Sequence, residues 1–193
     1  MDHVVVDVEI AKCIGEDGIT WNDTDKVGIS CAVVYEDRGD RFRVFGPNDL
    51  NALQDRLLVA ERITTYNGTR FDFPVIWRLP ARRIDSLPLA LPQKNDDLLA
   101  RIWRAMGLKD DEVTNAHKGW GLGIVAHGTL GIGKIGHGEL APKMYQEGRW
   151  QELVSYCADD VALTRDLARF IDRYHYVLNG KTGQKVYVPE WRG

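Results

Sequence analysis

The chain has 193 residues, a formal net charge of -3 and 44% hydrophobic residues, which is ordinary for a globular protein. There is no overall basic field, which argues against a non-specific coat protein for nucleic acid but not against a nuclease with local contacts. Three widely spaced cysteines indicate neither a disulfide framework nor a zinc site. We expect a cytoplasmic protein, because we find no signal peptide and no apolar run near the ~20 residues of a membrane span.

The first third of the chain predicts a β-meander followed by a helix and another strand. Short runs of β-branched and apolar residues indicate strands at residues 4–10, 27–35, 41–45 and 62–66. Apolar periodicity predicts a helix over about 48–59, with an inward face of Leu50, Leu53, Leu57 and Leu58.

The rest of the chain predicts mainly helices. They are expected at about 73–77, 97–106 and 150–173, with one short strand before residue 95, a Gly-rich stretch at 119–138 and a hairpin around Asn179-Gly180. This order predicts an α/β fold whose mixed sheet is flanked by helices. We expect a single domain over 1–193, with a core at about 3–173 and a hairpin or tail at about 174–193.

The first strand contains two acids, Asp7 and Glu9, within an otherwise apolar run. Side chains two residues apart on a strand share a face, so both carboxylates project from one side. Burying them side by side without a partner costs several kcal/mol each, and a hard cation such as Mg²⁺ or Mn²⁺ removes that cost. Alternatively, the strand ends near Asp7 and the acids lie in water.

Another acid follows the strand at 62–66. Asn67-Gly68 marks a tight turn, and Asp72 stands just before a short helix with Pro74 near its first turn. Asp72 is therefore either the N-cap of that helix or a carboxylate facing a metal, and an acid at a helix N-terminus can serve both purposes.

The long helix at 150–173 separates two adjacent acids by their phase. An apolar stripe runs along Trp150, Leu153, Val154, Cys157, Val161, Ala168 and Ile171. Asp159 lies opposite this stripe and should face solvent, whereas Asp160 lies on its shoulder, one turn after Tyr156. Alternatively, Tyr156 is a residue at the rim of the core beside a half-exposed acid.

Taken together, Asp-x-Glu, the Asp after the Asn-Gly turn and the Tyr-x-x-x-Asp helix resemble the DEDD superfamily of 3′→5′ exonucleases, which have a ribonuclease H-like fold. Tyr156 points to the DEDDy branch, because the other branch has a His at the position of Ser155. The resemblance covers residues 4 to about 170. It includes Gly121-Leu122-Gly123, Thr129-Leu130-Gly131, Gly138, Ala141-Pro142 and Gly148-Arg149-Trp150, a run similar to stand-alone exonucleases. One departure is Ile10, where many relatives have a hydroxyl residue.

The resemblance implies that Asp7, Glu9, Asp72 and Asp160 hold two Mg²⁺ or Mn²⁺ ions that activate water and stabilise the leaving oxygen. Tyr156 would orient the attacking water. The expected partner is the 3′ end of single-stranded DNA or RNA, and the products are nucleoside 5′-monophosphates. We also predict substrate contacts for Asn67, Phe71 and Lys134. Base stacking is considered for Trp77, Trp103 or Trp120, although each is more simply a core residue.

A nucleotide cofactor is not expected. Residues 131–136 match G-x-G-x-x-G and 128–134 match most of a P-loop, but neither follows a strand and opens a helix, and Ile135 replaces the required Ser or Thr. A catalytically silent nucleic-acid-binding module of the same fold and an endonuclease remain as alternatives. The complete acid set with Tyr156 argues against the first, and the Tyr-x-x-x-Asp helix against the second.

Overall fold

The computed structural model describes residues 1–81, 83–108, 117–133 and 140–191. A five-stranded sheet has the order β3-β2-β1-β4-β5. Its strands are β1 (His3–Ile10), β2 (Ile29–Glu36), β3 (Arg41–Phe45), β4 (Arg62–Thr65) and β5 (Asn95–Asp97). The first three form an antiparallel meander, and β4 and β5 add in parallel to β1. The expected mixed sheet is therefore confirmed.

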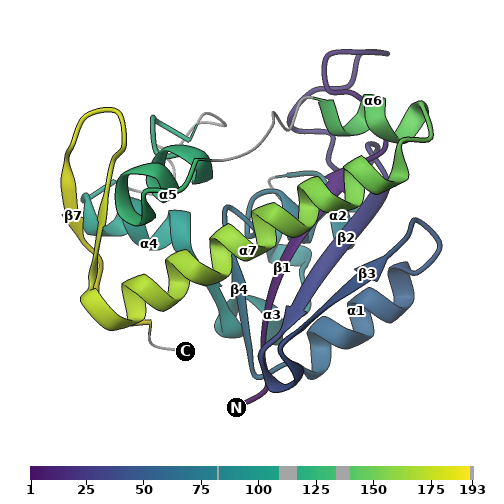
Figure 1. The fold of residues 1–193 in the computed structure, drawn as a ribbon. Helices are drawn as coiled ribbons and strands as arrows, with labels where there is room; N and C mark the ends of the chain where they lie inside the picture. The colour runs from purple at the N-terminus through teal and green to yellow at the C-terminus, as the bar shows by residue number, and fades with distance from the viewer. Residues whose placement is uncertain (82, 109–116, 134–139, 192–193) are drawn as a thin grey trace.

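Helices cover both faces of this sheet. They are α1 (Leu50–Val59), α2 (Asp72–Ile76), α3 (Ala90–Lys94), α4 (Leu98–Ala105), α5 (Leu122–Leu130), α6 (Ala141–Gln146) and α7 (Trp150–Tyr174), with 3-10 turns η1 (Asp37–Gly39) and η2 (Ile84–Ser86). In Figure 1, α7 runs obliquely across the front of β1 and β2, while α1 lies behind the sheet. None of the helices among the described residues is long and apolar enough to cross a bilayer.

The alternation of side chains along β1 decides which way its acids point. Val4, Val6 and Val8 pack in one core with side chains of α1, α2 and α3. Val5 points the other way, into a core shared with β2 and α7. Because side chains two apart share a face, Asp7 and Glu9 follow Val5 onto the α7 side of the sheet. The strand thus aims both acids at the long helix.

The two halves of α7 pack against different partners. Leu153, Cys157 and Val161 pack against β1 and β2. Leu167 and Ile171, further along, pack with side chains of α4, α5 and the C-terminal hairpin. The first half therefore crosses the strand that bears the acids, and the second half joins the sheet to the C-terminal region.

The C-terminal hairpin is confirmed as β6 (Tyr176–Leu178) and β7 (Lys185–Tyr187). It packs closely on α5, where the Gly180 N–H donates to the Ile124 carbonyl at 3.1 Å. A Cβ at Gly180 or at Gly128 would clash with the backbone of the other segment. These two glycines permit the close approach of helix and hairpin.

Several details differ from the sequence-based expectation, including the helices α3 and α6, which were not predicted. The strand expected from residue 27 begins at Ile29, since Gly28 adopts a φ of +65° that ends extended pairing. Leu58 is 41% exposed rather than part of the inward face. The Gly-rich stretch contains a helix, α5, whose Val125 is fully buried. Tertiary burial outweighs the ~1 kcal/mol that each glycine costs a helix.

Candidate active site

The two acids of β1 lie side by side against α7. Glu9 is 7% exposed and Asp7 is half-buried. One carboxylate oxygen from each, together with the Cys157 sulfur, forms a group whose atoms all lie within 4.8 Å of one another. Two hard oxygen donors and one thiol therefore converge at a point where a metal ion could be held.

Cys157 contacts Asp7 through its sulfur, at 3.6 Å from Asp7 Oδ2 and 3.4 Å from the Asp7 carbonyl oxygen. Burial raises the pKa of this thiol well above its usual value, and the neighbouring Cys31 thiol and the Asp7 charge add to the increase. The thiol therefore stays protonated and donates to Asp7. The predicted place of Cys157 in the buried apolar stripe of α7 is confirmed, but its contact with Asp7 was not predicted.

Asp72 is the first residue of α2 and is 2% exposed. Its Oδ1 accepts a hydrogen bond from the Val8 N–H at 3.1 Å. The pairing of β1 with β4 covers only residues 3–5 of β1. The Val8 N–H therefore lies beyond the hydrogen bonds between these two strands and bonds to the Asp72 side chain instead. The N-cap interpretation of Asp72 is wrong, since Phe71 occupies the cap position and makes no side-chain cap.

The electrostatic environment of Asp72 disfavours its charged form. Burial, together with the negative charges of Asp97 and Asp160, raises the pKa of Asp72 to about 7. The Val8 N–H opposes this shift but does not cancel it. The Asp160 charge on α7 also acts on Asp72, but the group of ligand atoms within 4.8 Å of one another consists of Asp7, Glu9 and Cys157 and includes neither Asp72 nor Asp160.

On α7, the predicted phase of the two adjacent acids is confirmed. Asp159 is exposed and Asp160 is only 4% exposed. Tyr156, one turn earlier, is also buried, so the interpretation as a half-exposed acid at the rim is wrong. Burial raises the pKa of Tyr156 strongly, as do the negative charges of Asp160, Glu9 and Asp7, in that order. The phenol therefore stays protonated in the field of three carboxylates.

The turn before α2 carries two of the three predicted substrate contacts. Asn67 is half-buried and has a φ of +72°. Phe71 is half-buried, and its ring centroid lies 6.2 Å from that of Trp21, in the loop between β1 and β2. Phe71 directly precedes Asp72, and the Phe71 N–H donates to the Asn67 carbonyl at 3.1 Å. The third residue, Lys134, lies outside the described residues.

Asp97 holds this turn in place, which the sequence analysis missed. Its carboxylate accepts from the N–H groups of Asn67 at 3.0 Å, Thr69 at 3.0 Å and Ala100 at 3.2 Å. Asp97 is thus the N-cap of α4 and also the anchor of the 67–69 turn. Its position at the start of a predicted helix is typical of the first role, but the second depends on how β4 and β5 pair.

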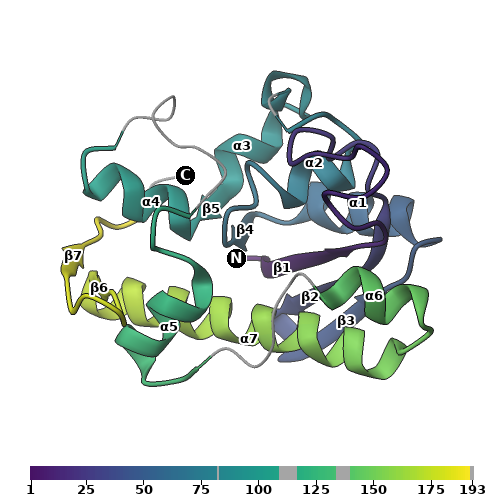
Figure 2. The ribbon, with the colours of Figure 1, turned by 90° about the horizontal axis from the view of Figure 1, so that it is seen from above.

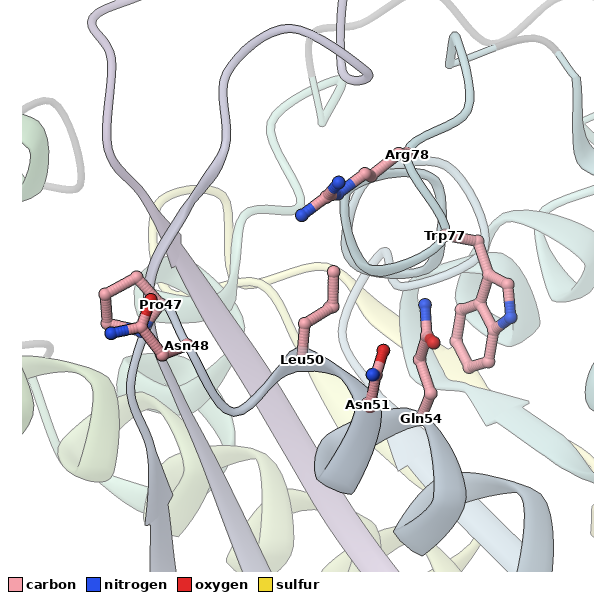
Figure 3. Close-up of a pocket in the computed structure, with 7 residues that line it drawn as sticks. All are labelled: Pro47, Asn48, Leu50, Asn51, Gln54, Trp77 and Arg78. Carbon is pink, nitrogen blue, oxygen red and sulfur yellow. The ribbon is translucent and has the colours of Figure 1, made fainter.

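A groove of about 410 Å³ lies between α1 and the end of α2, and Figure 3 shows its lining residues. They are Pro47, Asn48, Leu50, Asn51, Gln54, Trp77 and Arg78. None of the acids lines this groove, so it is separate from the carboxylate site. Trp103 and Trp120 are 3% and 2% exposed, which makes them core residues rather than stacking surfaces.

No family model and no curated protein matches the chain. Among solved structures it is similar to the family B DNA polymerase from the hyperthermophilic archaeon Pyrobaculum calidifontis, with a TM-score of 0.57 and 17% sequence identity. The match covers 89% of this chain and 24% of the polymerase chain, so this chain spans about a quarter of that length. The likeness shows a shared fold. With the five-stranded mixed sheet and its flanking helices, this fold is ribonuclease H-like, as the resemblance implied.

Proposed function

We propose that this chain is a metal-dependent 3′→5′ exonuclease that removes nucleoside 5′-monophosphates from the 3′ ends of single-stranded DNA or RNA. The observation that supports the proposal is the close pair Asp7 and Glu9 on β1. Two further buried acids, Asp72 and Asp160, lie within electrostatic reach: the Asp160 charge raises the pKa of both Asp72 and Tyr156, and the Asp7 and Glu9 charges also raise that of Tyr156. Acids this close destabilise one another unless a cation neutralises them. Evolution of such a cluster for stability alone would be costly, which supports a functional role.

The donor set fits two divalent ions. Four carboxylates carry four negative charges and two Mg²⁺ or Mn²⁺ ions carry four positive charges, and both ions prefer oxygen ligands. When bound, such ions supply a water of lowered pKa and stabilise the charge that develops on the phosphate and the leaving oxygen. We therefore assign Asp7, Glu9, Asp72 and Asp160 as the metal ligands.

The other residues of the site would orient the reacting groups. Tyr156 stays protonated, so its hydroxyl can donate to or accept from the attacking water but is a poor base. Cys157 donates to Asp7 and limits the rotation of that carboxylate. The turn anchored by Asp97 would present Asn67 and Phe71 to the strand, and Lys134 would contact a phosphate. We propose the whole chain, 1–193, as one such domain, and its cytoplasmic location stays a prediction.

The test uses 5′-labelled single-stranded DNA and a matching RNA, each incubated with Mn²⁺, Mg²⁺ or EDTA. We expect a metal-dependent ladder that shortens from the 3′ end. Asp160→Ala should reduce the rate by more than about 100-fold, since losing even an outer-shell partner of a metal costs up to that much. Asp159→Ala is the matched control, because its side chain is exposed on the same helix turn, and its rate should stay near that of the wild type.

Three outcomes would contradict the proposal. Loss of activity in Asp159→Ala but not in Asp160→Ala would place the site on another face of α7. Absence of a ladder from protein that still binds Mn²⁺ would favour a silent binding module of the same fold. Cleavage of a circular single strand would identify an endonuclease. Circular dichroism of each variant checks that the fold is retained.

A further inference from the structure

Trp21 is a large aromatic residue displayed at the surface of a well-ordered turn. It is 51% exposed and lies in the loop between β1 and β2. On one side of it, Thr20 donates to Asp23 Oδ2 through both its N–H, at 2.9 Å, and its hydroxyl, at 2.5 Å. On the other side, the Asn22 N–H donates to the Thr20 hydroxyl at 3.3 Å. These bonds close a tight turn with Trp21 at its corner.

The loop is also fastened to the segment that follows α2. The Thr24 hydroxyl donates to the Leu79 carbonyl at 2.6 Å, and the Ala81 N–H donates to the Asn22 carbonyl at 3.1 Å. Val27, which ends the loop, is fully buried in the core. Neighbours of Trp21 therefore supply the anchoring, and the indole itself contributes little to it. An exposed aromatic on a loop that its neighbours anchor is better explained by binding than by stability.

The indole packs beside the residue that precedes Asp72. Its ring centroid is 6.2 Å from that of Phe71, with an angle of 56° between the ring planes. Phe71 directly precedes Asp72, whose carboxylate reaches the β1 backbone between the two strand acids. Figure 2 shows the loop between β1 and β2 alongside α2, at the end of β1 that carries the acids. The half-buried Phe71 and the exposed Trp21 thus form an aromatic pair next to Asp72 in the chain.

We propose that Trp21 is a base-stacking residue, whose ring receives a nucleobase of the single strand that reaches the carboxylates. This inference rests on the proposed function and adds to it a binding surface for the base. Every nucleobase has a π-face, so stacking on indole holds single strands without requiring a particular sequence. A paired base is already stacked in its duplex, so Trp21 favours frayed or single-stranded ends.

The test is a double-mutant cycle between the protein and the strand. Binding of oligothymidylate is compared with binding of the same strand carrying abasic residues at its last three 3′ positions. The titrations use Ca²⁺, which takes the same oxygen ligands, and a gel confirms that the strand stays intact. We expect the wild type to bind the abasic strand about 5- to 100-fold more weakly, the range for one lost stack. Trp21→Ala should bind both strands with equal, weak affinity, and Trp21→Phe should restore part of the difference.

The matched control is Trp150→Ala. Trp150 is 42% exposed and packs edge-to-face on Tyr145 at the start of α7, so its removal should leave both affinities unchanged. With Mn²⁺, Trp21→Ala should raise KM for the normal strand while leaving kcat nearly constant, which is the pattern for a lost ground-state contact.

If Trp21→Ala weakened the binding of both strands by the same factor, or weakened neither, the stacking role would be overturned. The proposed function fails separately from it. If binding depends on Trp21 but the strands are never shortened, the stacking role stands and the exonuclease function is overturned. If Trp21→Ala shortens the strands normally and with an unchanged KM, the exonuclease function stands and the stacking role is overturned. A wild type that binds neither strand would overturn both.

Discussion

Two buried aspartates near the parallel edge of the sheet have opposite surroundings. Asp96, on β5, is fully buried and accepts from Arg62 at 2.5 Å and from Arg101 at 2.8 Å. Asp72, on α2, is almost equally buried, but the charges that raise its pKa are those of Asp97 and Asp160. Both carboxylates left water on folding, yet only the first is paired with two guanidinium groups.

The difference separates a structural acid from one that we propose to be functional. The Asp96 cluster joins β4, β5 and α4, and Arg101 also donates to the Pro189 carbonyl at 2.7 Å, which ties the C-terminal segment to the sheet. The cluster is complete within the chain. The charges that act on Asp72 are those of other acids, and such a cluster of negative charge is favourable only when a cation binds within it. Stability therefore depends on the first cluster, and we assign activity to the second.

The largest expected effect is on the structural side of this comparison. Asp96→Asn removes one partner from a buried ion pair and should cost about 3–5 kcal/mol of unfolding free energy. For a chain of this size that corresponds to a fall in Tm of roughly 6–20 °C, measured by thermal unfolding. Activity per folded molecule should be unchanged. A loss of activity without a loss of stability would make Asp96 part of the site.

A smaller effect is expected from metal binding at the functional cluster. At a free Mn²⁺ concentration 100 times Kd, the native state should gain about 2.7 kcal/mol, which raises Tm by roughly 5–10 °C. Asp7→Asn should abolish this gain, whereas Asp96→Asn should retain it despite its lower starting Tm. Differential scanning fluorimetry with and without EDTA measures both. An equal gain in the Asp7→Asn protein would mean that the ion binds elsewhere.

The smallest effect is a pH dependence of stability in EDTA. The pKa of Asp72 is about 7 in the native state, above the ~3.9 of an unfolded Asp. At pH values between these two pKa values the native state binds more protons than the unfolded state, so the free energy of unfolding falls as pH rises. Asp72→Asn lacks this titration and still accepts from Val8. Urea unfolding should therefore show the variant gaining roughly 2 kcal/mol relative to the wild type from pH 5 to pH 8. A constant difference would mean that Asp72 is ionised throughout.

Local periodicity was enough for several parts of the site. Alternation on β1 put Asp7 and Glu9 on one face, and the phase of α7 separated buried Asp160 from exposed Asp159. The hairpin around Asn179-Gly180 also followed from local residues. These features depend on residues two to four positions apart, whose relative directions are set by the backbone of a strand or helix.

Other parts depend on residues far apart in the chain. Asp72 meets the Val8 N–H across 64 positions, and Cys157 meets Asp7 across 150. The hydrogen bonds from the 67–69 turn to Asp97 and the packing of Trp21 against Phe71 also join residues that are far apart in the chain. None of these contacts leaves a local signal, because each forms only when separate elements pack.

The sequence by itself determined the main strands, the long helix with its inward face, and the set of acids that resembles an exonuclease. Only the tertiary structure decided that α7 crosses the acid-bearing face of β1, that Asp72 turns toward the strand rather than capping its helix, and that an indole packs beside the residue that precedes Asp72. The physical reason is that backbone geometry encodes direction over one or two turns, whereas burial of the shared cores decides which directions meet.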